Sequence, residues 1–541
     1  MIYFIPAWYQ KDKWCENEQY WYRRRMKTEF DDTVKHIQLF HRSQVHPFQI
    51  MLLSYAPNLR HFLHRQSVFR APYWSCFDAI QEIKRKKVKM FSFHNLNWPE
   101  HVEFIYSPFA LIAVLQGQKY AQVEFAEDGN PIQVDIYKDG KLHRKNIYDD
   151  RGFVSSTIVY ENGIVTYQDY LTDEGVWKIR HYFSDGHVEV NPKKATYLLM
   201  YQDREYVKEF DKITYNNMEL VISEVLESYL ALTKEEDMFC VAVHNLHNSM
   251  LQRVLQKRKT ILSFFEERFD IKKKMEQVLP MILEADYIIT DTQDNLMRIQ
   301  RRIEKPLKNI TDITPFDSRV DLGISQQLTV QKILVPVDDM DPEWFDEIIA
   351  CLGQYLPMNE NARVHLFTRT AEPGKKAQIL EQTRRSLKKA GLAVEWAREE
   401  ENSSMRENYL DGEVGIPVLF FVEQCVDELS VSKCVREQRL IVDMRKNSEL
   451  YLKIMGISMG IPQIVYRDTP FVEDGNNGMM VKNTAMLAGA IAYYLDDIKN
   501  WNEAMVYAYE LSKKYTTVVL TDKWKEVIDF VGRNSDFTTG N

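Results

Sequence analysis

Six turn dipeptides recur at a nearly constant interval between Tyr120 and Pro192, and this regularity restricts the fold more than any other feature of the chain. The segments between them are rich in Val, Ile, Thr, Tyr and Phe with partial alternation, as in consecutive β-hairpins. Successive glycines are 11 or 12 residues apart in Asp128-Gly129, Asp139-Gly140, Arg151-Gly152, Asn162-Gly163, Glu174-Gly175 and Asp185-Gly186. We predict an up-and-down antiparallel sheet. It is either a projecting insertion that offers a face or an edge to a partner, or a self-contained domain that caps a core.

The chain on both sides of this sheet alternates between short apolar runs and helix-length segments, which is typical of a doubly wound parallel sheet. The candidate strands of the first half are IYFIPAW, FQIMLLSYA, VKMFSF, MFCVAVHN and DYIITD. Those of the second half are KILVPV, ARVHLFTR, LAVEWA, IPVLFF, RLIVDM and PQIVY. A polar, weakly periodic segment at 314–327 separates the halves. We therefore predict an α/β fold with two Rossmann-like domains and the antiparallel sheet inserted in the first.

We divide the chain into four segments on this basis. Residues 1–115 and 206–325 form the two parts of the N-terminal Rossmann-like domain, and residues 116–205 form the inserted sheet. Residues 326–541 form the C-terminal Rossmann-like domain with its C-terminal helices. A chain of 541 residues is too long for one hydrophobic core, which agrees with a division into domains.

Composition excludes several classes of protein. A net charge of −9 over this length gives no field that favours nucleic acid as a partner. The six cysteines are scattered, with no Cys-x-x-Cys pair and no spacing that sets zinc ligands or a disulfide framework. The N-terminus lacks the features of a signal peptide, and no apolar run is long enough to cross a bilayer. We expect a cytoplasmic protein with reduced thiols.

Three basic stretches are compatible with a peripheral contact to a membrane. They occur at 84–89, 253–259 and 298–302. An anionic lipid surface attracts such clusters, but as the polar faces of helices they need no partner.

The stretch from Asp443 to Lys482 contains an apolar helix, the turn Gly460-Ile461-Pro462 and a strand. This stretch resembles the part of a retaining glycosyltransferase that binds the sugar-nucleotide donor. The carboxylates that contact the donor in such enzymes are missing here. Counted back by the spacing of those enzymes, the two expected glutamates fall on Asn447 and Met455, which do not ionise. Arg445 and Lys446 lie beside these positions and could still hold an anion, or they could be solvated loop charges. Alternatively, the stretch is an ordinary helix–turn–strand unit that does not descend from an enzyme, because a glycine and a proline after a helix are common in such units.

A second part of the expected donor site also differs from such enzymes. A basic pair usually follows the first strand of the C-terminal half and neutralises the donor's diphosphate. Here KILVPV is followed by Asp338-Asp339-Met340-Asp341. Three carboxylates would repel a diphosphate unless a divalent cation lay between them. Alternatively, Asp341-Pro342-Glu343 caps a helix. We predict no catalytic residue, no bound cofactor and no metal ion.

The opening YFIPAWY, followed by Trp14 and Tyr20-Trp21-Tyr22, and the stretch MRKNSELYLKIMGISMGIPQI resemble the first of the three Asp proteins of the bacterial accessory Sec system. The resemblance extends over the whole chain. It implies an inactive member of the glycosyltransferase-B fold. Such a protein works with the second and third Asp proteins and the accessory SecA motor in the export of glycosylated serine-rich-repeat adhesins, whose glycans it could bind.

Two other functions remain open. One is an active retaining glycosyltransferase that transfers sugar from a UDP-sugar to a serine-rich acceptor, because the Gly-x-Pro frame is intact. The other is a lectin-like module that acts without export partners.

Overall fold

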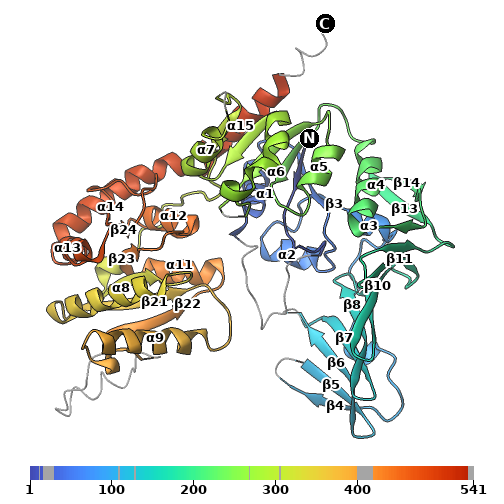
Figure 1. The fold of residues 1–541 in the computed structure, drawn as a ribbon, viewed down its shortest axis with the longest axis horizontal. Coiled ribbons are helices and arrows are strands. Elements are labelled where there is room, and N and C mark those ends of the chain that lie inside the picture. The colour runs from blue at the N-terminus through green and yellow to red at the C-terminus, as the bar shows by residue number, and fades with distance from the viewer. Residues whose placement is uncertain are drawn as a thin grey trace.

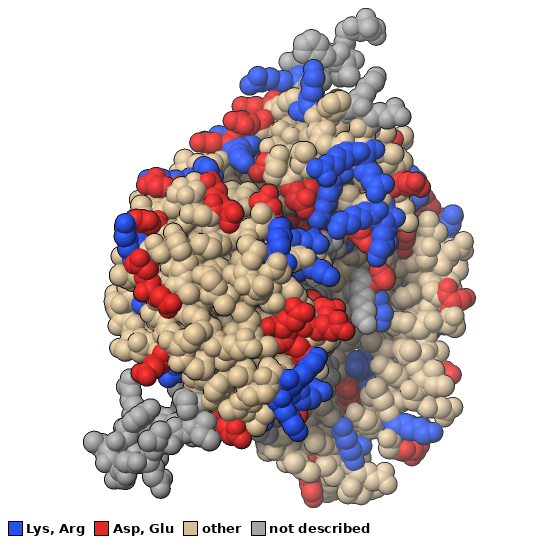
Figure 2. Space-filling view, turned by 60° about the vertical axis from the view of Figure 1, so that its left-hand side comes forward, with Lys and Arg blue, Asp and Glu red and all other residues tan. Residues whose placement is uncertain are grey.

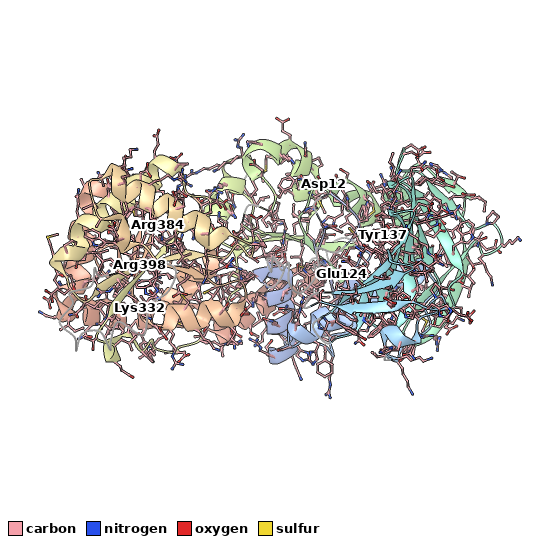
Figure 3. The ribbon with its side chains drawn as sticks, turned by 90° about the horizontal axis from the view of Figure 1, so that it is seen from below. Asp12, Glu124, Tyr137, Lys332, Arg384 and Arg398 are labelled. Atoms are coloured by element: carbon pink, nitrogen blue, oxygen red, sulfur yellow. The ribbon has the colours of Figure 1, made fainter. Side chains whose placement is uncertain are left out.

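The computed structural model describes residues 1–10, 12–15, 30–89, 91–107, 110–126, 129–266, 268–303, 306–398 and 418–533. Figure 1 shows two α/β bodies with a long antiparallel sheet that projects from the N-terminal one. The predicted α/β class and the inserted sheet are therefore confirmed. Seen from below, the C-terminal body, the N-terminal body and the antiparallel sheet lie in a row, with Lys332 in the first and Tyr137 in the last (Figure 3).

The N-terminal body contains a parallel sheet in the order β19-β18-β17-β16-β1-β2-β3. Its strands are β1 (Ile2–Ile5), β2 (Phe48–Leu52), β3 (Tyr73–Ser75), β16 (Met238–Ala242), β17 (Lys259–Phe264), β18 (Tyr287–Thr290) and β19 (Ile310–Asp312). Its helices are α1 (Asp32–Ser43), α2 (Leu59–Arg65), α3 (Cys76–Ile80), α4 (Met218–Leu230), α5 (Asn248–Val254), α6 (Ile271–Glu284) and α7 (Gln293–Gln300). The prediction of a strand at VKMFSF is wrong, because its described residues form a loop that leads into a 3₁₀ turn at Phe93–Asn95. The strand beside β2 is instead the three-residue β3, which is too short for its periodicity to be recognised.

The antiparallel sheet has the order β15-β12-β11-β10-β9-β8-β7-β6-β5-β4. Its strands are β4 (Glu103–Tyr106), β5 (Ala110–Leu115), β6 (Gln118–Phe125), β7 (Pro131–Lys138), β8 (Lys141–Asp149), β9 (Phe153–Glu161), β10 (Ile164–Leu171), β11 (Trp177–Tyr182), β12 (Val188–Val190) and β15 (Thr214–Tyr215). Strands β13 (Thr196–Tyr201) and β14 (Arg204–Glu209) form a separate hairpin. The sheet extends on both sides of the predicted range 116–205, because the apolar run before residue 116 pairs as a hairpin and β15 pairs with β12.

The C-terminal body contains a parallel sheet in the order β22-β21-β20-β23-β24-β25. Its strands are β20 (Gln331–Pro336), β21 (Ala362–Thr368), β22 (Phe420–Gln424), β23 (Gln438–Asp443), β24 (Gln463–Val465) and β25 (Gly478–Met480). Its helices are α8 (Pro342–Tyr355), α9 (Lys375–Lys389), α11 (Glu428–Arg436), α12 (Leu450–Ser458), α13 (Thr484–Leu495) and α14 (Ile498–Ser512). LAVEWA is not the predicted strand, since it forms a 3₁₀ turn at Val394–Trp396 and only Ala397 bridges to Phe420.

The last described helix, α15 (Thr517–Arg533), leaves the C-terminal body and packs on the N-terminal sheet (Figure 1). The indole ring of Trp524 is fully buried, with its centroid 6.0 Å from that of Phe4 and 5.1 Å from that of Phe40. The chain therefore passes between the two bodies twice. The predicted C-terminal segment 326–541 thus includes a helix that belongs with the first body; the four domain boundaries otherwise stay a prediction.

A groove separates the C-terminal body from the rest of the molecule on the side shown in Figure 2. Lysine and arginine side chains gather along its upper border, and acidic side chains gather lower on its rim. The C-terminal body presents a broad face with few charges on the same side.

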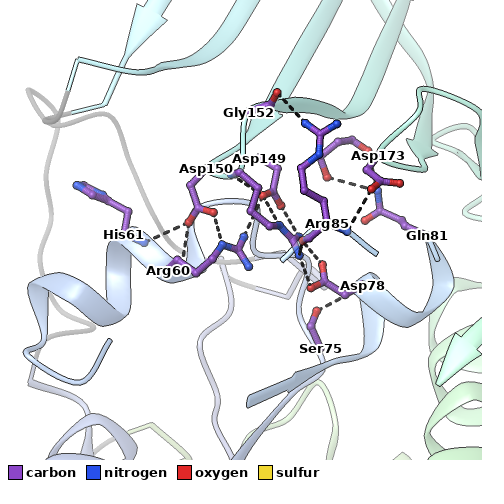
Figure 4. Close-up of polar contacts among 12 residues, drawn as sticks. Arg60, His61, Ser75, Asp78, Gln81, Arg85, Asp149, Asp150, Gly152 and Asp173 are labelled. Carbon is purple, nitrogen blue, oxygen red and sulfur yellow. Dashed lines mark hydrogen bonds and ion pairs between the residues drawn. The ribbon is translucent and has the colours of Figure 1, made fainter. Parts of the chain in front are cut away.

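A network of charged side chains attaches the antiparallel sheet to the N-terminal body (Figure 4). Arg151, at the turn between β8 and β9, pairs with Asp78 on α3 at 2.8 Å and with Asp149 at 2.7 Å. Arg60 on α2 contacts Asp149 at 3.0 Å and also pairs with Asp150. Burial disfavours the charged carboxylate of Asp149, but Arg60 and Arg151 together hold its pKa below the usual range. The junction therefore depends on several partly buried ion pairs at once.

Candidate functional site

The carboxyl ends of β20, β21 and β23 point toward the N-terminal body at the start of α12. In open α/β sheets, ligands bind at the carboxyl ends of the strands, so this is where a sugar donor would lie. The predicted order of helix, turn and strand is confirmed here. Helix α12 ends at Ser458, Gly460 has a φ of 68°, and β24 begins at Gln463.

Arg445, a predicted anion contact, already forms an ion pair with a carboxylate of the same chain. Its side chain is only 4% exposed, and Asp443, at 2%, lies beside it. Nε donates to Oδ1 of Asp443 at 2.8 Å and Nη2 donates to Oδ2 at 2.9 Å. A bidentate pair of this kind uses the donor edge of the guanidinium that would otherwise bind a phosphate.

The other predicted positions lie on two different elements. Lys446 and Asn447 lie in the loop that precedes α12, so Asn447 does not lie on the helix. Met455 is on α12, half-buried against an apolar cluster. Asn447 and Met455 therefore present a loop amide and a packed thioether at the two positions where the spacing of retaining glycosyltransferases predicts glutamates.

The pair formed by Arg369 and Glu449 was not found from the sequence. Arg369 follows β21, and its Nη1 donates to Oε2 of Glu449 at 2.7 Å. Glu449 is the N-cap residue of α12, where a carboxylate is favoured by the helix dipole. The guanidinium carbon of Arg369 also lies 3.5 Å from the ring centroid of Phe30 in the N-terminal body. The only sequence signal was an arginine at the end of a predicted strand.

The acidic run after β20 is explained by hydrogen bonds within the chain. Asp338 accepts from Oγ1 of Thr368 at 2.6 Å and from the backbone N–H of Arg369 at 2.7 Å. Asp341 caps α8 by accepting from the backbone N–H of Glu343 at 3.0 Å, with Pro342 in the first turn. The capping interpretation is thus confirmed, and Asp338 positions the end of β21.

Aromatic side chains connect the two bodies at the start of α12. The ring of Tyr451 on α12 lies 4.8 Å from that of Phe30 and 5.1 Å from that of Phe316, centroid to centroid. Glu266 reaches the same region. Its side chain is exposed to solvent, but the limited hydration there, then Glu449 and Asp291, raise its pKa above the ordinary value. Side chains of the protein therefore fill space between the two bodies at the start of α12.

The predicted aromatic group at the N-terminus is only partly described. Trp8 and Tyr9 are buried, and they are held by Asp31 at 2.9 Å and by Nδ1 of His247 at 2.8 Å. Trp14 packs against the N-terminal core. Tyr20-Trp21-Tyr22 lies outside the described residues.

Two guanidinium groups at the expected donor site face carboxylates: Arg445 faces Asp443, and Arg369 faces Glu449. A diphosphate would have to displace these acids, and the energy of the existing pairs would be lost.

Comparisons with known proteins agree with this fold and site. The family model for the first Asp protein of the accessory Sec system matches residues 1–530. The first Asp protein of the accessory Sec system of Streptococcus gordonii is 34% identical over 539 residues, covering 98% of this chain and 100% of that protein. A chain in the crystal structure of accessory secretory proteins 1, 2 and 3 of Streptococcus pneumoniae superimposes with a TM-score of 0.78 at 30% identity, covering 98% of this chain and 99% of that one.

The same fold occurs in an enzyme. The pneumococcal O-GlcNAc transferase GtfA, solved with UDP and GlcNAc, aligns with a TM-score of 0.69 at 11% identity, over 98% of this chain and 99% of that one. This likeness confirms the predicted glycosyltransferase-B-like fold. Among the described residues, no helix is both long enough and apolar enough to cross a membrane. The family match over nearly the whole chain shows that this protein belongs to the family of the first Asp protein of the accessory Sec system.

Proposed function

We propose that the protein is a non-catalytic component of the accessory Sec system. It acts in the cytoplasm with the second and third Asp proteins and the accessory SecA motor to export glycosylated serine-rich-repeat adhesins. Family membership supports this role. The pneumococcal relative, which was crystallised with proteins 2 and 3, supports the choice of partners.

The non-catalytic part of the proposal rests on one observation: the expected donor site lacks the carboxylates that would orient a sugar donor, and its arginine Arg445 is paired with Asp443. Retaining glycosyltransferases of this fold use carboxylates to orient the donor, and Asn447 and Met455 supply none. The buried pair of Arg445 with Asp443 removes a cation that a diphosphate would need. The active-transferase alternative requires all three features to be compensated by other residues.

The C-terminal body offers a surface suited to a protein partner. Exposed apolar side chains project from α13 and α14, namely Met486, Tyr493, Ile498, Val506 and Tyr509. Apolar patches of this kind mark interaction sites in soluble proteins.

The antiparallel sheet offers a second surface. Strand β4 is an edge strand, and among the described residues it pairs only with β5. Its side chains Ile105 and Tyr106 are exposed. An open edge of this type can accept a strand from a partner through main-chain hydrogen bonds.

A membrane surface is a weaker candidate partner. The basic stretch 84–89 lies in a loop and not on a helix. Lys84 and Lys86 face Glu205 and Asp203 at 3.3 and 3.8 Å, which reduces the charge available to anionic lipid. We therefore favour protein partners.

The test measures sugar transfer and complex formation with the partner proteins on the same preparation. The purified protein is incubated with a panel of UDP-sugars and a serine-rich acceptor, and in parallel with the second and third Asp proteins. We expect no transfer and a stable complex. Transfer at enzymic rates, or failure to assemble with either Asp protein, contradicts the proposal. Capture of glycopeptide without any Asp protein would instead support the lectin-like alternative.

A further inference from the structure

Two cysteines and a glutamate that are separate in the sequence meet at one edge of the C-terminal sheet. The ligand atoms of Glu423, Cys425 and Cys434 all lie within 4.8 Å of one another. Glu423 is on β22, Cys425 follows this strand, and Cys434 is in the last turns of α11. Figure 1 shows β21, β22 and α11 together in the lower part of the C-terminal body.

The backbone explains why these three side chains converge. Glu423 and Cys425 are two positions apart along an extended chain, so they point to the same side of the sheet. The backbone N–H of Cys425 donates to the carbonyl of Thr368 at 3.0 Å, which continues the pairing of β22 with β21. Asp427 then starts α11 with a capping box, and the helix returns Cys434 to the same side.

Neighbouring residues hold two of the three side chains in place. Nδ1 of His365, on β21, lies 3.0 Å from Oε1 of Glu423. The side-chain amide of Gln438 donates to the carbonyl of Cys434 at 2.8 Å and lies 3.8 Å from its sulfur. Metal ligands in proteins are typically oriented by contacts of this kind, including a histidine beside a carboxylate.

We propose that Glu423, Cys425 and Cys434 bind a zinc ion through one carboxylate and two thiolates. Thiolates select zinc-like ions over Mg²⁺ and Ca²⁺, which prefer oxygen ligands. With zinc–sulfur bonds of about 2.3 Å, the two sulfurs of a tetrahedral site are about 3.8 Å apart, so the site needs only small rotations of side chains to close. The Glu423 side chain is 38% exposed and Cys434 is half-buried, which gives an ion access from solvent.

The charge of the surroundings suits a divalent cation. With an ion bound, two thiolates and a carboxylate would carry three negative charges. Lys332 on β20 lies close enough to influence both Glu423 and Cys434, but it is already paired with Glu437 at 2.7 Å. An ion with charge +2 would therefore neutralise most of the cluster.

The position of the site connects it to the contact between the two bodies. Helix α11 carries Cys434 near its end and Glu428 in its first turn, and Glu428 accepts from Nζ of Lys35 in the N-terminal body at 2.6 Å. A metal ion that fixes α11 to β22 would hold Glu428 in position for this contact. We expect hydrogen exchange in α11 to slow when the ion binds.

The experiment uses Co²⁺ as a spectroscopic probe and Zn²⁺ as the competitor. The full chain is reduced, freed of metal by chelation, checked for six free thiols by alkylation and mass spectrometry, and titrated with Co²⁺. We expect a thiolate-to-cobalt charge-transfer band that saturates at about one ion per chain and disappears when Zn²⁺ is added. Wild-type protein that is fully reduced but gives no such band overturns the proposal.

Variants separate the site from other thiols. The double variant Cys425→Ser/Cys434→Ser should lose the band, whereas Cys351→Ser, which changes a cysteine on α8, should keep it. Glu423→Gln should weaken Co²⁺ binding by at least about tenfold, and His365→Gln by about 10- to 100-fold. Circular dichroism and melting curves show that each variant is folded. An unchanged band in the double variant contradicts the assignment. So does a native Cys425–Cys434 disulfide in a chain that binds no metal after reduction.

Discussion

Replacing Arg151 with leucine should release the antiparallel sheet from the N-terminal body while leaving the C-terminal body intact. The Arg151 side chain is 5% exposed and bridges Asp78 on α3 and Asp149 at the end of β8. Leucine fills part of the space but offers no charge. Asp149 would then remain buried with Arg60 as its cation, while Asp78 can be solvated because it is partly exposed.

The size of the effect follows from the burial of the network. Removal of one partner from a buried ion pair costs about 3–5 kcal/mol. Because Arg60 still neutralises Asp149, we expect a loss of about 3 kcal/mol, at the lower end of that range. At 25 °C this corresponds to an increase of about 100-fold in the population of the locally opened junction.

Hydrogen exchange followed by mass spectrometry measures this opening directly. A single unfolding free energy is not well defined for a protein of several domains, so a local measurement is preferable. Peptides from α3 and from β8–β9 should lose about 100-fold in protection. Peptides from β20 and β21 should not change. Arg151→Lys should lie between the two, because lysine keeps the charge but cannot pair bidentately.

The matched control is Lys86→Ala, which removes a lysine from an exposed pair with Asp203 close to the same junction. Exposed pairs contribute little to stability, so its exchange should match that of the wild type. A change smaller than about threefold at α3 and β8–β9 in Arg151→Leu would refute the reasoning. An equal loss of protection in β20 and β21 would also refute it, because the effect would then be global.

Three further perturbations test other parts of the structure. Gly152→Ala should destabilise the junction by at least about 2 kcal/mol in denaturant titrations, since an added Cβ would lie 2.0 Å from the carbonyl oxygen of Lys89. Gly163→Ala, which has the same φ of 85° and open space around it, should cost only about 1–2 kcal/mol; equal losses would count against the clash. Glu266→Gln should remove a pH dependence of the contact between the two bodies. The folded state raises the pKa of this carboxyl from 4.5 toward about 8, so the contact weakens as pH rises through that window, by an amount that solvent screening reduces because the side chain is exposed. Fluorescence energy transfer between the bodies would show this change in wild type but not in the variant, and an unchanged wild-type signal would disprove it. Trp524→Ala should cost about 3–5 kcal/mol and expose α15 to proteolysis, whereas Trp524→Phe should resist cleavage, because most of the ring packing remains. Equal cleavage of wild type and Trp524→Ala would show that α15 does not depend on this ring.

The sequence was informative where local chemistry decides the structure. The dipeptides Asp139-Gly140 and Asn162-Gly163 have positive φ at both residues, which is the geometry of a two-residue hairpin turn, so their spacing was enough to predict the antiparallel sheet. Pro342 after Asp341 likewise predicted the start of α8. Both signals lie within a few residues of the structure they specify.

The sequence was less informative where distant segments meet. VKMFSF and LAVEWA have the composition of strands, but neither forms one, since neighbouring elements and not periodicity decide the outcome. Arg445 was predicted as a possible anion contact, and nothing in the sequence shows that Asp443 takes its bidentate donor edge. The convergence of Cys425 with Cys434 was missed for a similar reason, because their spacing matches no short metal-binding motif.

The return of α15 to the first body determines the order in which the protein can fold during synthesis. The C-terminal sheet and its helices are complete once the chain has been made as far as Tyr515, and among the described residues none that follows belongs to their core. The first sheet, although its strands are made earlier, lacks the Trp524 side chain that packs against Phe4 and Phe40. The half of the protein that leaves the ribosome first is therefore the last to become fully packed, and in the meantime its apolar surface is available to chaperones.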